Sequence, residues 1–485
     1  MTEQSKYPVS ILSGLPSADP ARSEQLLSEA MKEFDSKIVV LDDDPTGVQT
    51  VHDISVYTDW TEESMRQGFQ EEGSMFFILT NSRSFSAEKT ALVHARIAEN
   101  LEKVSAETGM PFFLISRGDS TLRGHYPLEM DVLRRNSHLN TADIEILCPF
   151  FPEGGRYTFG DVHYVQDGEW FIPAGETEFA RDKTFGFHAS DLKEYVEEKT
   201  GGRKKAADCL SISLEELAGC DVDSIEEKLR SAPAGTTVIV NAISYADLKL
   251  FCAALVRATK DKGDRPGRHF LARTAAAFPK VMGRVTDIPL LCREDLKRAE
   301  SAGKPQTRNG GLVIIGSHVK KTTDQLECLK RACLPIEYIE FDVNAIFRDG
   351  GLISERDRAA ALADQAIGAG KTTVIYTTRK LLAPESLSKE ELLSISVQIS
   401  EALTGILSCL TKAPGFLIAK GGITSADVGT KGLLVKKAVV MGQIKKGIPV
   451  WKTGPESRFP DLPYIIFPGN VGGTDALREI VEELL

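Results

Sequence analysis

The sequence lacks the features that mark several large classes of protein. Its 485 residues include 58 lysines and arginines against 69 aspartates and glutamates, a formal net charge of −11 at pH 7. A general nucleic-acid-binding protein needs an excess of basic surface, and this balance argues against one. No apolar run approaches the ~20 residues of a membrane span, and residues 1–14 lack a basic region followed by an apolar one. We therefore expect a cytoplasmic protein without nucleic-acid or membrane partners.

The eight cysteines and eight histidines are scattered along the chain. No CxxC pair occurs, which indicates reduced and mostly buried thiols. Because no HxxxH or mixed His/Cys spacing occurs either, we predict no metal site formed by protein ligands alone. The sequence also has no GxGxxG after an apolar run and no GxxxxGK[ST], which argues against a dinucleotide-binding fold and a P-loop.

What the sequence does contain is one pattern repeated six times, in which a short apolar run stops at a small, polar segment that in four cases contains glycine. The polar segments are 42–47, 81–84, 117–124, 317–318, 420–424 and 469–474. In open parallel α/β sheets, ligands bind just outside the carboxyl ends of the strands. Three of the segments lie before residue 130 and three after residue 310. The pattern therefore predicts either two binding clefts or one cleft shared by two domains.

The alternation of apolar runs and amphipathic stretches predicts two α/β domains. Expected strands lie at 37–41, 76–80, 112–116, 144–148, near 240 and 270, and at 312–316, 337–341, 372–376, 415–419 and 464–467; expected helices include 20–34 and 86–104. This alternation is typical of βαβ units. We predict a mainly parallel sheet flanked by helices in each domain, with the active site in the cleft between the domains.

Two irregular segments interrupt this pattern. Residues 149–190 are rich in glycine and proline, with hairpin-like patterning over 157–173, and such insertions often form a lid or a pocket wall. Residues 294–310 lose their apolar periodicity and gather glycine, proline and charge, so we place the linker there. The predicted domains are 1–295 and 310–485.

Three consecutive aspartates follow the first of the six apolar runs. Packing Asp42, Asp43 and Asp44 together costs free energy through repulsion and raises at least one pKa. A proton, a metal ion or a hydrogen-bonding substrate should offset this cost. For a single aspartate, capping of the next segment would be the simpler interpretation, but for the triplet we favour a functional role.

Arginines gather at the ends of the next two strands. Arg83 follows one strand, and Arg117 and Arg123 follow the other, with Asp119 and Ser120 between them. Each guanidinium can clamp a carboxylate through two parallel hydrogen bonds, while Asp119 and the hydroxyls suit a small polyol. The alternative, which the sequence leaves open, is that the arginines pair with the aspartate triplet and hold the strand ends together.

Glycine-rich segments end strands of the second half. Gly421, Gly422 and Gly469 place backbone amides where no Cβ blocks the approach of a ligand, shortly before expected helices. Ser317 adds a hydroxyl at the end of another strand of this half. A turn would explain any one glycine pair, but several such ends in one domain predict a nucleotide site.

Together these motifs resemble those of the four-carbon acid sugar kinase family. The resemblance runs in order over about residues 37–475 and rests on the segments 43–47, 119–124, 148–156, 316–317, 421–425 and 469–473. Two departures stand out, because Asp42 replaces the alanine and Pro45 the phenylalanine that the family usually has. The resemblance implies that 1–295 is an acid-sugar-binding domain and 310–485 a nucleotide-binding domain.

The family phosphorylates a hydroxyl of threonate, erythronate, 3-oxo-tetronate or 3-oxo-isoapionate, which implies ATP as phosphoryl donor and Mg²⁺ as its companion ion. The resemblance leaves open which sugar acid and which hydroxyl are involved, and whether the protein forms a homodimer. The implied activity is that of a phosphotransferase with an alcohol group as acceptor.

The motifs predict roles for individual residues. Catalysis is expected of Asp44, Asp119 and Arg123. Substrate binding is expected of Asp42, Asp43, Thr46, Gly47, Asn81, Ser82, Arg83, Arg117 and Ser120. Nucleotide binding is expected of Ser317, Gly421, Gly422, Ile423, Thr424, Gly469, Asn470 and Gly472. In this hypothesis Arg83 and Arg123 hold the substrate carboxylate, and Asp44 or Asp119 accepts the hydroxyl proton.

Two other functions are open at this point. Residues 42–46 fit the Asp-x-Asp-x-Thr motif of haloacid-dehalogenase-like phosphatases, with Asp42 as nucleophile and Asp44 as acid. That function needs a downstream lysine and an acidic pair at further strand ends, and the first half offers no convincing pair. A non-catalytic sensor of sugar acids would bind its ligand without releasing ADP.

Overall fold

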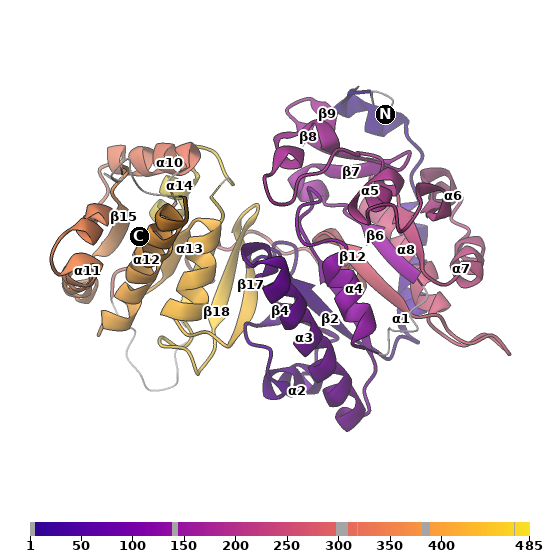
Figure 1. Cartoon of the computed structure of the whole chain (residues 1–485), viewed down its shortest axis with the longest axis horizontal. Coiled ribbons are helices and arrows are strands. Elements are labelled where there is room, and N and C mark those ends of the chain that lie inside the picture. Colours follow the sequence, from indigo (N-terminus) through magenta and orange to yellow (C-terminus); the bar gives the residue numbers. More distant parts are fainter. Residues whose placement is uncertain (1–4, 138–143, 297–308, 318, 381–388, 470) are drawn as a thin grey trace. The chain divides into compact units, whose positions relative to one another are not determined.

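The chain forms two compact units (Figure 1). The computed structural model describes residues 5–137, 144–296, 309–317, 319–380, 389–469 and 471–485. One unit contains residues 1–50 and 59–286, and the other contains 51–58 and 287–485. The chain therefore enters the second unit briefly before residue 59 and returns to it after residue 286. Most of the predicted linker, residues 297–308, lies outside the described residues.

Within its described residues, the first unit has a sheet of seven parallel strands. Their order is β10 (Leu210–Ile212), β11 (Thr236–Val240), β6 (Ile144–Cys148), β12 (Phe270–Thr274), β5 (Phe112–Arg117), β2 (Lys37–Asp42) and β4 (Met75–Leu79). The strands β2, β4, β5 and β6 are buried along their whole length, as the continuous apolar runs require. The strands predicted for this half are confirmed.

Two groups of helices cover the faces of this sheet (Figure 1). One group contains α1 (Pro20–Met31), α7 (Val222–Ser231) and α8 (Tyr245–Ala258), and the other contains α2 (Glu62–Gln70), α3 (Ala87–Thr108) and α4 (Leu128–Arg135). The shorter α5 (Leu192–Lys199), α6 (Leu214–Ala218) and α9 (Ala277–Met282) complete the unit's long connections. Local sequence sets the ends of these helices: Asp19 caps α1 ahead of Pro20, and α3 stops at Gly109, whose φ is +67°.

The irregular segment after β6 contributes to a small antiparallel sheet. Its strands are ordered β1 (Tyr7–Pro8), β9 (Trp170–Pro173), β8 (Val162–Asp167) and β7 (Arg156–Phe159). This confirms the hairpin patterning predicted over 157–173. The sheet has an aromatic core in which the rings of Phe159 and Tyr164 stack with centroids 4.2 Å apart.

The second unit combines five parallel strands with an antiparallel extension. The parallel strands are ordered β14 (Ile336–Phe341), β15 (Thr372–Thr377), β13 (Leu312–Ile315), β16 (Leu417–Lys420) and β19 (Pro463–Phe467). The antiparallel strands β18 (Ile448–Thr453), β17 (Lys437–Lys445) and β3 (Ile54–Tyr57) continue the sheet from β19. The five parallel strands were predicted and are confirmed. The three antiparallel strands β18, β17 and β3 were not predicted. β3 comes from the early part of the chain and pairs with β17, with Ser55 opposite Val439.

Helices also flank this second sheet. α10 (Lys320–Arg331) packs against α14 (Ala476–Leu484) over a core that includes Val313, Ile418 and Ile465. A second group contains α11 (Gly351–Gly368), α12 (Lys389–Cys409) and α13 (Gly422–Asp427). The predicted class of two α/β units with mainly parallel sheets is confirmed.

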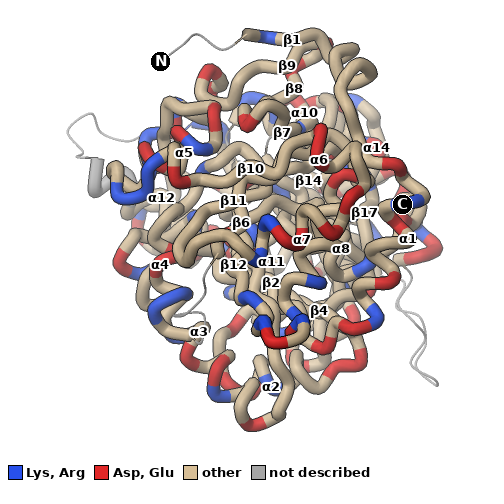
Figure 2. The backbone as a smooth tube through the Cα atoms, turned by 90° about the vertical axis from the view of Figure 1, so that its right-hand side faces the viewer, with Lys and Arg blue, Asp and Glu red and all other residues tan. Residues whose placement is uncertain are grey.

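The surface of the first unit carries both signs of charge side by side, as Figure 2 shows around α2 and α7. Exposed ion pairs there include Arg66 with Glu63 in α2 and Arg265 with Glu227 of α7. All eight cysteines are free, but only Cys148, Cys209 and Cys252 are buried, so the expectation of mostly buried thiols is wrong.

None of the helices in the described ranges has both the length and the apolarity of a membrane span.

Candidate functional site

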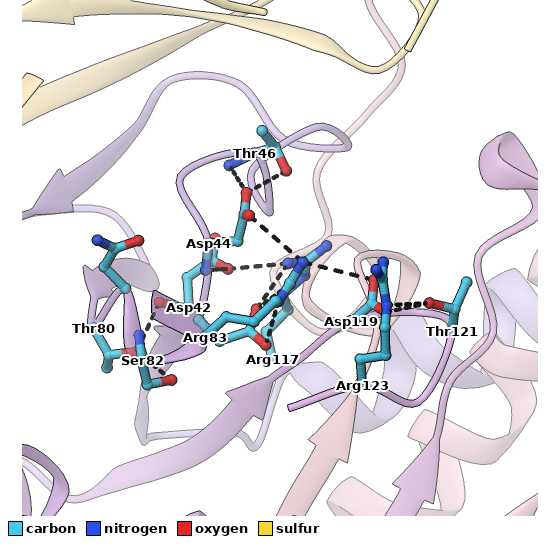
Figure 3. A network of polar contacts seen from close by, with 12 residues as sticks. Asp42, Asp44, Thr46, Thr80, Ser82, Arg83, Arg117, Asp119, Thr121 and Arg123 are labelled. Atoms are coloured by element: carbon cyan, nitrogen blue, oxygen red, sulfur yellow. Dashed lines mark hydrogen bonds and ion pairs between the residues drawn. The ribbon is translucent and has the colours of Figure 1, made fainter. Parts of the chain in front are cut away.

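The carboxyl ends of β2, β4 and β5 meet at the point where the strand order reverses. The chain runs from β2 to β4 on one side and then crosses to β5 on the other side of β2. Such switch points are where open α/β sheets bind ligands. The backbone carbonyl of Asp42 accepts hydrogen bonds from the amide and hydroxyl of Thr80 and from the amide of Asn81. The predicted segments 42–47, 81–84 and 117–124 are therefore brought together (Figure 3).

Asp42 and Asp43 are buried and paired with Arg117. Their side chains are 1% and 2% exposed, and Arg117 Nη1 lies 3.1 Å from Asp42 Oδ1 and 3.4 Å from Asp43 Oδ1. Asp42 Oδ2 is buried without a hydrogen-bond partner among the described residues. Gly47 closes over this carboxylate, because a Cβ there would lie 2.1 Å from both Asp42 oxygens. The glycine of this motif therefore makes room for the aspartate.

Arg83 is committed to the same group of aspartates (Figure 3). Its Nε and Nη2 donate to the two oxygens of Asp43 at 3.2 and 2.5 Å, a bidentate arrangement. Its Nη1 lies 3.5 Å from Asp44 Oδ2 and 3.8 Å from Asp119 Oδ1. These contacts match the alternative in which Arg83 and Arg117 pair with the triplet and hold the strand ends together.

Asp44 presents one carboxylate oxygen outward. Both the amide and the hydroxyl of Thr46 donate to Asp44 Oδ1, at 2.8 and 2.5 Å. Its Oδ2 has only the longer contact with Arg83, and the side chain is 20% exposed. Asp44 is thus held in place by one oxygen and accessible at the other.

The loop after β5 holds Asp119 beside Arg123. Arg123 Nε donates to Asp119 Oδ2 at 2.7 Å, and the Thr121 hydroxyl donates to the same oxygen. Leu122 has a φ of +68°, and its carbonyl accepts a hydrogen bond from Tyr195 Oη at 2.9 Å. These contacts hold the loop in a conformation whose backbone is strained at Leu122.

His163 in β8 fastens the small antiparallel sheet to this loop. Its Nε2 lies 2.8 Å from the carbonyl of Ser120, and its Nδ1 lies 2.9 Å from Thr158 Oγ1. Burial lowers the pKa of His163 to about 4, so the ring is neutral at pH 7. A neutral ring with this surrounding donates from Nε2 and accepts at Nδ1. Ser120, predicted to bind substrate, contributes its backbone to this contact.

A second buried ion pair lies behind the loop, and no sequence motif pointed to it. Arg273 of β12 donates to Glu129 and, at 2.9 Å, to Ser116 Oγ, while Ser82 Oγ donates to Glu129 at 2.6 Å. A Cβ at Gly118 would lie 2.3 Å from Arg273 Cζ, so the glycine admits this guanidinium. Ser82, predicted to bind substrate, is buried and its hydroxyl is directed at Glu129.

The charges of this network set the pKa values of its aspartates. Burial raises the pKa of Asp42 to about 7 against the opposing effect of Arg117. Burial acts in the same direction on Asp44 and Asp119, but Arg83 and the hydrogen bonds to each carboxylate, from Thr46 to Asp44 and from Arg123 and Thr121 to Asp119, together outweigh it and lower the pKa of both. The raised pKa predicted for the triplet therefore belongs to Asp42.

In the second unit, three strand ends also meet. β13, β16 and β19 are neighbours, and Ser317, Gly421 and Gly469 follow them. A Cβ at Gly421, whose φ is +123°, would lie 3.0 Å from Ser317 Cβ, and one at Gly469 would lie 3.5 Å from Ser317 Oγ. A Cβ at Gly316 would lie 2.5 Å from Thr424 Oγ1. The predicted residues Ser317, Gly421, Thr424 and Gly469 therefore form one edge.

The remaining predicted nucleotide-side residues differ in their surroundings. A Cβ at Gly422 would have nothing within 4 Å, and the side chain of Ile423 is 68% exposed. Gly472, with a φ of +80°, packs against Ala476 at the start of α14. Asn470 lies outside the described residues.

Two cations lie at this edge: Lys420, which belongs to the predicted segment 420–424 but was assigned no role, and Arg379, which was not among the predicted residues. Lys420 is fully buried, with its Nζ 2.6 Å from the Pro468 carbonyl and 3.7 Å from the centroid of the Phe467 ring. Burial lowers its pKa to about 7, and Lys321 acts in the same direction. Arg379, after β15, donates from Nη1 to the Ser317 carbonyl at 2.7 Å, while its Nε and Nη2 are buried without described partners.

The network does not form a ready-made cage for a metal ion. Among the described residues, no group of three or more histidine, cysteine, aspartate or glutamate side chains has the arrangement to hold one. The carboxylates of Asp42, Asp43 and Asp119 are already engaged by arginines. Mg²⁺ that arrives with a nucleotide needs only one or two carboxylates besides phosphates and water.

Replacing Asp42 by asparagine should change how stability depends on pH. Because its pKa rises from 3.8 to about 7 on folding, the stability that it contributes is present below about pH 4 and lost as pH rises through 7. Relative to the wild type, Asp42→Asn should gain up to about 1.4 kcal/mol of unfolding free energy per pH unit between these values. Urea titrations from pH 5 to 8 measure this, and the exposed Asp167→Asn serves as control. Parallel curves for Asp42→Asn and the wild type would contradict the raised pKa.

Replacing Gly47 by alanine should destabilise the first unit. The added Cβ would overlap the Asp42 carboxylate, and such overpacking costs about 1–3 kcal/mol. Gly14→Ala is the matched control, because a Cβ there meets nothing within 4 Å. Urea unfolding at constant pH compares the two variants, and equal stabilities would show that the loop yields without cost.

The two units match two family models. A sugar-binding N-terminal domain matches residues 38–282, and a nucleotide-binding C-terminal domain matches residues 312–477. A Haemophilus influenzae protein of the DUF1537 family has 17% identity over 92% of this chain and 100% of its own, with a TM-score of 0.60. A proposed tRNA synthase from Salmonella typhimurium LT2 has 16% identity over 91% and 98%, with a TM-score of 0.61.

At these identities the likeness to the solved structures shows the fold alone. The comparison with curated proteins finds no significant match. The two domain models together cover most of the chain, in the order that the sequence motifs predicted. The chain therefore belongs to the four-carbon acid sugar kinase family, with a sugar-binding N-terminal domain and a nucleotide-binding C-terminal domain.

Proposed function

We propose that the protein is an ATP-dependent kinase that phosphorylates a hydroxyl of a small sugar acid of the tetronate, 3-oxo-tetronate or 3-oxo-isoapionate type. The observation that carries this proposal is the accessible Asp44 Oδ2 beside the Asp119–Arg123 pair, at the switch point of a sugar-binding domain. A nucleotide-binding domain in the same chain supplies the second requirement of a kinase.

Asp44 is the carboxylate best placed to accept the hydroxyl proton of the substrate. The two donors of Thr46 fix its Oδ1, so Oδ2 is oriented and partly exposed. Asp119 is more fully committed, since Thr121 and Arg123 both donate to its Oδ2. Phosphoryl transfer asks the protein mainly for alignment and charge compensation, so an aspartate with a lowered pKa serves as an orienting base.

MgATP would enter as a substrate and bind at the edge formed by Ser317, Gly421 and Gly469. The amide of Gly421 donates to the Phe467 carbonyl, so the amides that would suit phosphate oxygens are those that follow it at the start of α13, where Gly422 has no Cβ. Lys420 holds the carbonyls of Pro468 and Gly469, which keeps the glycine loop in place. Arg379 adds guanidinium nitrogens without described partners beside Ser317, and an anionic ligand would satisfy them.

Nothing in the structure favours the phosphatase alternative. A nucleophilic Asp42 would have to reach a phosphate, but its side chain is 1% exposed, paired with Arg117 and covered by Gly47. The sensor alternative is distinguished by chemistry. ADP release from MgATP, measured across a panel of four- and five-carbon sugar acids, tests the kinase proposal, and binding without turnover throughout the panel would contradict it.

Replacing Asp44 by asparagine should lower kcat by about 100-fold or more, which is the usual contribution of a positioned base. The amide keeps the size of the side chain and a hydrogen bond with Thr46, but it cannot take the proton. The KM for ATP should stay within about threefold, since Asp44 belongs to the sugar-binding domain. A coupled ADP assay measures both, with Asp167→Asn as control. A kcat close to that of the wild type would remove Asp44 from this role.

Replacing Gly421 by alanine should weaken nucleotide binding by roughly tenfold, or about 1.4 kcal/mol. The alanine would be strained at a φ of +123°, and its Cβ would press on Ser317. Gly351→Ala is the control, because its φ is also positive but a Cβ there meets nothing. Titration calorimetry with ATP, without sugar acid, compares the variants. Equal affinities in the two would place the nucleotide elsewhere.

A further inference from the structure

Two arginines lie against one aromatic ring beside the loop after β5. The guanidinium carbons of Arg123 and Arg156 lie 4.9 and 5.6 Å from the centroid of the Phe179 ring. Both distances are within the range of a cation–π contact. Arg156 begins β7, and Phe179 belongs to the short helical turn Glu178–Arg181 that follows β9. The ring therefore gathers two positive charges from separate segments of the first unit.

Arg156 is not neutralised by the protein. Within the described residues, no acidic side chain forms an ion pair with it, and its Nε is buried without a hydrogen-bond partner. Burial and the neighbouring charge of Arg123 both lower the pKa of Arg156, and only Asp119 opposes them. A guanidinium in this position lacks the anion that usually accompanies a partly buried arginine.

The nearby acids are already occupied. Asp119 Oδ2 accepts from Arg123 Nε and Thr121 Oγ1, and its Oδ1 faces Arg83. Asp182 is the other acid whose charge reaches Arg123, and its Oδ1 accepts from the backbone amides of Thr184 and Phe185. Arg123 uses only Nε in these contacts, so its two terminal nitrogens have no described partner. Arg123 and Arg156 therefore have hydrogen-bond donors without partners, and the described acids near them are already engaged.

The backbone under Arg156 is rigid. Its amide and carbonyl both pair with Phe151, at 2.9 and 3.0 Å. Gly155, with a φ of +75°, packs against the side chain of Gln166 in β8. His163 and Thr158 then tie the same sheet to Ser120 in the loop of Asp119. Arg156 and Arg123 are thus held at a fixed separation, as recognition of a planar anion requires.

We propose that Arg156, with the free nitrogens of Arg123 and with Phe179 as a platform, binds the carboxylate of the substrate. This inference rests on the proposed function. It assigns carboxylate binding to Arg156 in place of Arg83, because the Nε and Nη2 donors of Arg83 are occupied by Asp43. A carboxylate supplies the bidentate acceptor and the negative charge that the two guanidiniums lack. The subsite would select acids over the corresponding neutral polyols.

Titration calorimetry without nucleotide tests this subsite, with erythronate, threonate and the neutral polyol erythritol as probes. Arg156→Met should weaken binding of the acids by roughly 10- to 100-fold, the value of a charge-assisted hydrogen-bonded pair, and should reduce the preference for acids over erythritol. Arg156→Lys keeps the charge without the planar guanidinium, so its affinity for the acids should lie between those of the wild type and Arg156→Met. Arg181→Met, at an exposed arginine of the same turn as Phe179, should match the wild type.

Three results would overturn the subsite: no binding of either acid by the wild type, unchanged affinities in Arg156→Met, or an equal loss for acids and polyol, which indicates a structural role. Should Arg156→Met fold poorly, Arg156→Lys gives the same comparison. ADP release reports separately on the kinase proposal. A wild-type protein that binds acids through Arg156 but releases no ADP from MgATP would lose the kinase function and keep the subsite.

Discussion

The repulsion among three consecutive carboxylates at the end of β2 is the constraint on which the first unit's site depends. Asp42 and Asp43 are almost fully buried, and without opposite charges nearby they could not both ionise. Arg117 and Arg83 supply those charges from the ends of the two strands that flank β2. The ion pairs therefore fix the relative positions of three strand ends. They also leave one aspartate, Asp42, with a raised pKa.

That constraint determines which groups are left for a ligand. An arginine whose donors are occupied by aspartates cannot also bind a substrate carboxylate. Arg83 and Arg117 therefore have a structural role, in which they hold the strand ends together. The groups with spare capacity are Asp44 Oδ2, the terminal nitrogens of Arg123 and the whole guanidinium of Arg156. An acceptor and two donors of this kind match a molecule with a hydroxyl and a carboxylate. The same chemistry underlies the proposed substrate class.

Much of the fold was predictable because apolar runs and their polar ends are local signals. β3, β17 and β18 were not predicted, although β17 alternates between buried and partly exposed residues. Period-2 alternation was the signal that could have found it. The pairing of β3 with β17 joins residues almost 400 positions apart, and only the folded structure decides it. The site residues were found by motif, but whether Arg83 faces an aspartate or a ligand depends on the spacing of three strands. Glu129 and Arg273, which meet between α4 and β12, gave no motif at all.

The edge of the second unit where a nucleotide is proposed to bind has fewer charged side chains than the site of the first unit. Its edge is formed by backbone and hydroxyl groups around Ser317, Gly421 and Gly469, whose close approach excludes a Cβ. The cations there, Lys420 and Arg379, both donate to backbone carbonyls of the same edge. Burial lowers the pKa of Lys420 to about 7, so its amine can hold the loop at little electrostatic cost. Arg379 keeps its charge and has buried nitrogens to spare, which makes it the group at this edge that a phosphate would most stabilise.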